Sequence, residues 1–199
     1  MNPLNSITGT LVGGVVVTVV LAVVVSMGVH FNALSFIGWI HVLAGITWIG
    51  LLYYFNLVQV PALAEAAVDQ GGPGGAGIRK YVAPRALAWF RWAAVVTWLS
   101  GAAYLGHVHL FLDAFALGLT GGNMQATVIG VGAWLGTIML FNVWVLIWPN
   151  QKKVLGLVEC TAEEISKARR ISFIASRTNT LLSIPLIMSM VGFHEGFFL

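Results

Sequence analysis

Long apolar stretches constrain the fold of this chain more than any other feature of its sequence. A helix needs about 20 consecutive apolar residues to cross the hydrocarbon core of a bilayer. Stretches of this kind occur at roughly residues 8–29, 34–61, 84–107, 125–148 and 171–195. Only 9% of the residues are charged, whereas a soluble domain carries about 25%. The sequence therefore predicts an all-α integral membrane protein with five transmembrane helices.

The first stretch differs from the other four. TGTLVGGVVVTVVLAVVVSMGV is valine-rich and has no polar motif, and it lacks the basic start and the small-residue cleavage site of a signal peptide. We expect residues 1–32 to form a separate transmembrane helix that is retained, and residues 33–199 to form a four-helix bundle. A Gly-rich flexible loop is expected at residues 64–77.

Turn and cap residues delimit the later helices. Pro149 is expected to end the fourth predicted helix, because proline removes a helical hydrogen bond. Thr161 and Glu164 fit a capping box that begins the fifth helix.

The basic residues predict the orientation of the helices. With five spans, all of them fall on or near one side of the membrane, and the positive-inside rule makes that side cytoplasmic. The N-terminus is then cytoplasmic and the C-terminus periplasmic. The basic residues lie in loops and helix ends, and they form no basic face or motif of a nucleic-acid-binding domain. The basic residues are Arg79, Lys80, Arg85, Arg91, Lys152, Lys153, Lys167, Arg169, Arg170 and Arg177.

All the histidines fall on the opposite side; they are His30, His41, His107, His109 and His194. His41 lies about 10 Å below the outer surface, where an imidazole needs a hydrogen-bond partner or a metal. Gly45 and Trp48 share its helix face. Gly45 leaves room for a flat macrocycle, and the indole of Trp48 can pack on its edge.

This pattern predicts a haem b site in the outer half of the bundle. His41 is the expected iron ligand, and its partner is one of His107, His109 and His194. Of these three, we expect His194 to be the second metal ligand. A copper or zinc ion bound by the same imidazoles is the alternative, with copper as the named cofactor. Two structural interpretations stay open, in which His41 bonds to a neighbouring helix and the other histidines are ordinary interface residues.

A second polar group lies in the cytoplasmic half. Arg91, Arg177, Asn142, Asn56 and Asn179 come from four predicted helices at similar depth. Arginines at this depth pair with an anion, line a wet cavity or snorkel to lipid headgroups. With the amides they predict a donor-rich site for a planar, oxygen-rich anion. In the alternative, the arginines snorkel and the amides bridge helices.

Four blocks of sequence carry a family resemblance. HVLAGITWIGLLYYFNLVQVPAL (41–63), WFRWAAVVTWLSG (89–101), FNVWVLIWPNQKKVLG (141–156) and ASRTNTLLSIPLIM (175–188) resemble the membrane domain of the PuuD-type urate hydroxylase family, the membrane-bound urate oxidases of bacteria. The similarity extends over roughly residues 33–192.

The resemblance implies a domain in the bacterial inner membrane that oxidises urate to 5-hydroxyisourate and passes electrons to a periplasmic cytochrome c. The chain has no C-x-x-C-H motif, so the C-terminal cytochrome domain of the family is expected to be absent from it. The candidate residues that lie inside matching blocks are His41, Arg91, Asn142, Arg177 and Asn179.

Two other functions compete with this membrane redox protein. The chain could be a non-catalytic accessory subunit of a larger respiratory or monooxygenase complex, because Gly132, Gly136, Ser100 and Gly101 allow close helix approach. It could also be a copper- or metal-handling membrane protein. Metal and haem analysis distinguishes these possibilities.

Overall fold

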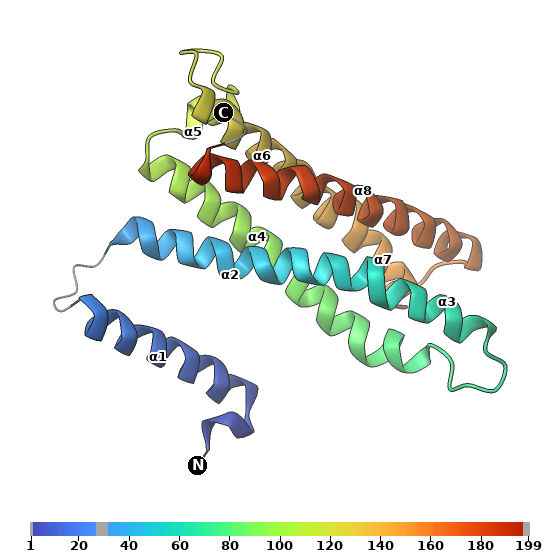
Figure 1. The fold of residues 1–199 in the computed structure, drawn as a ribbon. Helices are drawn as coiled ribbons and strands as arrows, with labels where there is room; N and C mark the ends of the chain where they lie inside the picture. Colours follow the sequence, from blue (N-terminus) through green and yellow to red (C-terminus); the bar gives the residue numbers. More distant parts are fainter. Residues whose placement is uncertain (1, 27–31, 197–199) are drawn as a thin grey trace. The chain divides into compact units, whose positions relative to one another are not determined.

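The structure is a computed structural model that describes residues 2–26 and 32–196 (Figure 1). Within these ranges it is helical throughout, without a β-strand. It divides into two compact units, Met1–Ala33 and Leu34–Leu199.

The first unit consists of the short 3₁₀ helix η1 (Pro3–Asn5) and helix α1 (Ile7–Ser26). Among the residues of α1 whose side chains are described, none is buried, and its valines and leucines are exposed on every side. A helix that is apolar all round is suited to lipid.

The second unit contains four long helical rods joined by short connections. The first rod is α2, η2 and α3, the second is η3 and α4, the third is α6, η4 and α7, and the fourth is α8. Helices α6 and α7 pack against α8, and α4 and α5 pack against α6. The elements are α2 (Ala33–Tyr53), η2 (Tyr54–Gln59), α3 (Val60–Val68), η3 (Ile78–Val82), α4 (Ala83–His107), α5 (Phe111–Phe115), α6 (Met124–Phe141), η4 (Asn142–Ile147), α7 (Trp148–Val154) and α8 (Ala162–Glu195).

Four helical stretches among the described residues are long and apolar enough to cross a membrane. They are Ile7–Val24, Ala33–Val68, Met124–Val154 and Ala162–Glu195. The chain therefore has the helices of a multi-pass membrane protein. Helix α4 is 25 residues long but does not meet the same requirement, so the fifth span stays a prediction.

Each π-helical segment is followed by a proline. Pro61, Pro84 and Pro149 each occupy the second position of the α-helix that follows η2, η3 or η4. A proline inside an α-helix lacks an N–H and clashes with the carbonyl four residues before it. The wider π turn shifts the hydrogen-bond register and relieves both problems.

The π segments correct two sequence-based expectations. Pro149 does not end the fourth predicted helix, because the rod continues through η4 to Val154. The expected flexible loop at residues 64–77 is helical up to Val68, since α3 continues past Pro61. The capping box of α8 is confirmed: Thr161 Oγ1 accepts a bond from the Glu164 backbone N–H, and Glu164 Oε2 accepts one from the Thr161 N–H.

The two halves of the bundle repeat one another. WIGLLYYFN (48–56) on the first rod corresponds to WLGTIMLFN (134–142) on the third, and both reach into a π segment. Arg91 follows Asn56 by 35 residues (91 minus 56), and Arg177 follows Asn142 by the same 35 residues (177 minus 142). The bundle is therefore built from two similar helix pairs, in which residues 86 positions apart (142 minus 56) correspond.

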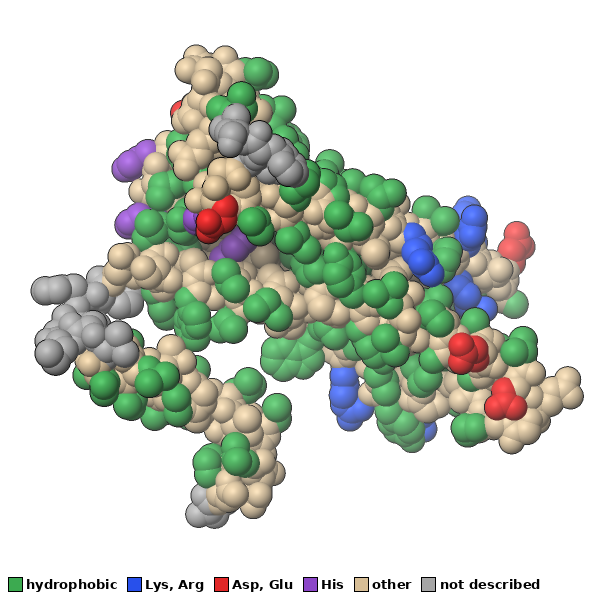
Figure 2. Space-filling model, in the orientation of Figure 1, with side chains coloured by type: hydrophobic (Ala, Val, Ile, Leu, Met, Phe, Trp, Pro, Cys, Tyr) green, Lys and Arg blue, Asp and Glu red, His purple; other side chains and the backbone are tan. Residues whose placement is uncertain are grey.

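Charge and histidine separate along the bundle. Figure 2 shows the histidine side chains at one end of the second unit and the Lys and Arg side chains in its other half. His30, predicted to belong to the histidine end, lies outside the described residues. Between the two ends, Trp48, Leu52, Phe90 and Val143 belong to a continuous buried core.

Candidate functional site: a cavity at the histidine end

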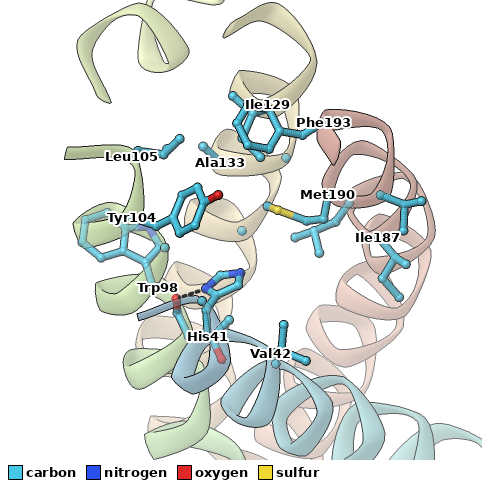
Figure 3. Close-up of a pocket in the computed structure, with 18 of the residues that line it drawn as sticks. His41, Val42, Trp98, Tyr104, Leu105, Ile129, Ala133, Ile187, Met190 and Phe193 are labelled. Carbon is cyan, nitrogen blue, oxygen red and sulfur yellow. Dashed lines mark hydrogen bonds between the residues drawn. The ribbon is translucent and has the colours of Figure 1, made fainter. Parts of the chain in front are cut away.

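A cavity of about 690 Å³ lies among α2, α4, α6 and α8 at the histidine end. Its size falls within the range of about 300–1,000 Å³ that ligand and cofactor pockets occupy. Aliphatic and aromatic side chains form most of its wall, as Figure 3 shows for Val42, Tyr104, Ile129 and Ile187. Glycines from three of the helices widen it: Gly38, Gly45, Gly50, Gly101, Gly132 and Gly136.

His41 projects from α2 into this cavity (Figure 3). Its Nδ1 lies 2.8 Å from the backbone oxygen of Thr97 on α4. A carbonyl oxygen only accepts hydrogen bonds, so Nδ1 carries the proton and Nε2 keeps its lone pair. Within the described part of the chain, no hydrogen bond to Nε2 is present. Metal-binding histidines have this arrangement, with one nitrogen bonded to a carbonyl and the other available for the metal.

Gly101 makes the position of the imidazole possible. A Cβ at residue 101 would lie 2.9 Å from His41 Cε1 and 3.1 Å from Nδ1, inside van der Waals contact. Sequence reasoning recognised Gly101 as a close-packing residue but did not connect it with His41. The sequence shows only that Gly101 is a small residue one helical turn after Thr97. It does not indicate that the His41 side chain packs against this glycine.

Gly45 and Trp48 lie on the same cavity wall as His41. Trp48 is 2% exposed, and its indole Nε1–H is buried with no hydrogen-bond partner among the described residues. Buried donors are normally satisfied, so this N–H is available to a water or a ligand.

The other candidate histidines lie in different surroundings. His194 lines the rim of the cavity and is exposed, with its ring 5.0 Å from that of Phe193 and 6.2 Å from that of Tyr104. His107 ends α4 and His109 follows it in the left-handed region at φ 57°; both are exposed, and neither lines the cavity. The structure thus brings His194 to the cavity of His41, Gly45 and Trp48, and leaves His107 and His109 outside it.

A metal site built from several side chains is not formed in the described residues. No group of three or more His, Cys, Asp or Glu side chains lies close enough there to hold an ion. A haem makes a smaller demand, because the macrocycle supplies the equatorial ligands and the protein adds one or two axial ones.

The predicted inner amides are buried and bonded within the protein. Asn142 Nδ2 donates to Asn179 Oδ1 at 2.8 Å, and Asn179 Nδ2 donates to the Met139 carbonyl at 3.0 Å. Asn56 Nδ2 donates to Ser176 Oγ at 2.8 Å and to a carbonyl of its own helix. These bonds tie the rods that contain η2 and η4 to α8.

The two inner arginines face different partners. The Arg91 guanidinium lies 3.7 Å from the ring centre of Trp148, and Arg177, which is exposed, lies 5.2 Å from that of Phe173. Neither forms an ion pair within the described residues. The five predicted inner residues are therefore of two kinds: three buried amides, and two arginines that are more exposed than the amides.

One comparison with known proteins decides the family. The family model described as "Urate oxidase N-terminal" matches residues 26–121 and 110–199. The chain belongs to the urate oxidase N-terminal family. No curated protein and no solved structure matches it significantly. The expected relation to membrane-bound urate oxidases is thereby confirmed at the level of this family.

In this urate oxidase N-terminal chain, each matched segment contains one of the two helix pairs. The cavity lies between them, with His41 and Thr97 from the first pair and Gly132 and Met190 from the second. Chemically, it offers an apolar chamber, one imidazole lone pair and one unpaired indole N–H. Such a chamber is suited to a large flat ligand that binds through a metal.

Proposed function

We propose that the protein is a membrane oxidoreductase of the urate hydroxylase type. It binds haem b at His41 and passes electrons from urate, or a similar planar anion, to a periplasmic cytochrome c. The observation that carries this proposal is the His41 imidazole, held by Thr97 in the tautomer that directs its free Nε2 toward a cavity of about 690 Å³.

The residues around the cavity fit a haem. His41 would hold the iron, Gly45 and Gly101 leave space beside it, and the apolar wall would exclude water from the macrocycle. When bound, the haem supplies one-electron transfer between the two sides of the bundle.

The substrate belongs at the other end of the bundle in this proposal. Arg91 and Arg177 would neutralise a urate-like anion, because each guanidinium is without an ion-pair partner in the described residues. Asn56, Asn142 and Asn179 tie the rods of η2 and η4 to α8, the helix that carries Arg177. They would reach the anion only by exchanging their present hydrogen bonds. Oxidation of urate to 5-hydroxyisourate adds the oxygen of one water and releases two protons and two electrons. The cytochrome c would accept the electrons one at a time.

The proposal includes a topology in the bacterial inner membrane. Helix α4 would serve as the fifth span, with the N-terminus cytoplasmic and the C-terminus periplasmic. The separation of histidines and basic residues along the bundle supports this orientation. It places the haem near a periplasmic acceptor and the arginines near cytoplasmic urate.

An oxidised-minus-reduced visible spectrum of the purified protein, with pyridine haemochromogen quantification, tests the cofactor. About one b-type haem per chain is expected, lost in His41→Ala and kept in the control His107→Ala, whose side chain lies outside the cavity. A folded wild-type protein without a chromophore would contradict the haem proposal and favour the accessory subunit.

Anaerobic addition of urate tests the substrate. Urate should reduce the haem of the wild-type protein. Arg91→Ala and Arg177→Ala together should abolish this reduction while the haem content is unchanged. Equal reduction in the double variant would remove the arginines from the substrate site.

A further inference from the structure

The second axial position of the proposed haem is the question that the histidines leave open. His107 and His109 do not line the cavity. His194 does, but it lies exposed at the rim with its ring against aromatic neighbours. A different side chain of α8 lies deeper, four residues before His194.

That side chain is Met190. It is partly buried and lines from α8 the same cavity that His41 lines from α2. Figure 3 shows its thioether sulfur extending into the same space as the His41 imidazole. Methionine sulfur and histidine nitrogen form one of the established pairs of axial haem ligands.

Two contacts with α6 hold Met190 in this direction. Ser189 Oγ accepts a hydrogen bond from the Gly132 backbone N–H at 2.9 Å and donates to the Val128 carbonyl at 2.5 Å, which ties this turn of α8 to α6. A Cβ at Gly132 would lie 2.8 Å from Met190 Cε, so the absence of a side chain there makes room for the thioether methyl group.

The internal repeat supports the same direction. Met190 corresponds to Tyr104 of the first helix pair (190 minus 104 equals 86), and both side chains line the cavity. The fold therefore directs this position into the cavity in both halves. A phenol in one half and a thioether in the other give the two equivalent positions different chemistry.

We infer that Met190 is the axial partner of His41. This inference rests on the proposed function, because it concerns the same haem. Methionine coordination raises the reduction potential relative to a pair of histidines. The site would then be matched to an acceptor of the cytochrome c class.

The test compares ferric absorption and midpoint potential in variants of the full-length protein. The wild type should show the long-wavelength charge-transfer band of a thioether–iron bond. Met190→Leu should keep the haem through His41, lose the band, become high-spin and have a lower midpoint potential. Met190→His should stay low-spin without the band, also at a lower potential, and it serves as a second variant if the leucine change impairs folding.

Two controls complete the design. Met188→Leu changes a neighbouring methionine that is 42% exposed and does not line the cavity, and it should leave the band unchanged. His194→Ala should also keep it. A haem-containing wild type without the band, or a band that survives in Met190→Leu, would overturn the inference while the haem site stands. A folded wild type without haem would overturn both.

Discussion

The imidazole of His41 occupies a space that exists because residue 101 has no side chain. The ring is fixed on one side by the carbonyl of Thr97, 2.8 Å from Nδ1, and on another by the backbone of Gly101. A ligand group held in this way loses little conformational freedom on binding, which favours affinity.

Gly101→Ala tests this arrangement. The added methyl group would meet His41 Cε1 at 2.9 Å, and moving the ring costs about 1–3 kcal/mol. We expect haem affinity to fall by about tenfold or more, measured by haem titration of the apoprotein. Gly106→Ala on the same helix is the matched control, because a Cβ there meets nothing within 4 Å. Equal affinity in the two variants would contradict the proposed role of Gly101.

At the residue scale, the sequence could predict candidates but not their contacts. His41 was identifiable because an imidazole in an apolar run needs a partner, and Gly45 and Trp48 followed from helical spacing. Met190 was not identifiable, since a methionine in an apolar helix is usually a core or lipid-facing residue. The pairing of Asn142 with Asn179 depends on the rotation of two helices, which a one-dimensional pattern does not contain.

At the scale of helices, the π segments place polar residues inside an apolar bundle. Asn56 lies in η2 and Asn142 begins η4, and both side chains are buried and bonded to α8. A π turn widens the helix and changes the direction of the side chains that follow it. The prolines after each segment favour this wider turn, so the asparagines are held at fixed positions along their rods.

The Asn142–Asn179 pair should stabilise the contact between η4 and α8. Asn179→Leu removes a partner from Asn142 and from the Met139 carbonyl, and we expect a loss of about 1–2 kcal/mol in the free energy of unfolding. Asn142→Leu combined with Asn179→Leu should cost less than the sum of the single changes, because no amide is then left unpaired.

Unfolding of the detergent-solubilised protein by a denaturing detergent measures these differences. Asn150→Leu is the control, since that amide bonds only a carbonyl of its own helical rod, and its effect should stay within about 0.5 kcal/mol. Additive single changes would show that the two asparagines do not act as a pair.

Helix positions were largely predictable from hydropathy, because three of the four rods contain an apolar stretch long enough to cross a membrane. Helix ends were harder to predict. Pro149 usually ends an α-helix, and the π turn that accommodates it here has no simple sequence signature. The repeat was present in the sequence as WIGLLYYFN (48–56) and WLGTIMLFN (134–142), but its spacing exceeds the periods of common repeat proteins.

At the scale of the whole molecule, the single cysteine offers a direct test of orientation. Cys160 lies in the connection between α7 and α8, at the basic end of the bundle. The proposed topology places it in the cytoplasm. A membrane-impermeant maleimide should therefore label it in inside-out vesicles and not in intact cells.

The matched control places a thiol at the opposite end. Leu119→Cys, combined with Cys160→Ser, introduces it in a connection where Leu119 is 83% exposed. This variant should be labelled in intact cells. Labelling of Cys160 itself in intact cells would reverse the proposed orientation.

The bond from His41 to Thr97 ends on a main-chain oxygen, and this has a consequence for how the family varies. Residue 97 can change its side chain without losing the acceptor, so positions 41 and 97 need not co-vary. Because Thr97 is itself buried, a mutational scan should find that side chains of similar size at position 97 keep this anchor, whereas a change of His41 removes it. Neither sequence co-variation nor a mutational scan would therefore reveal the His41–Thr97 hydrogen bond, although this bond fixes which imidazole nitrogen meets the ligand.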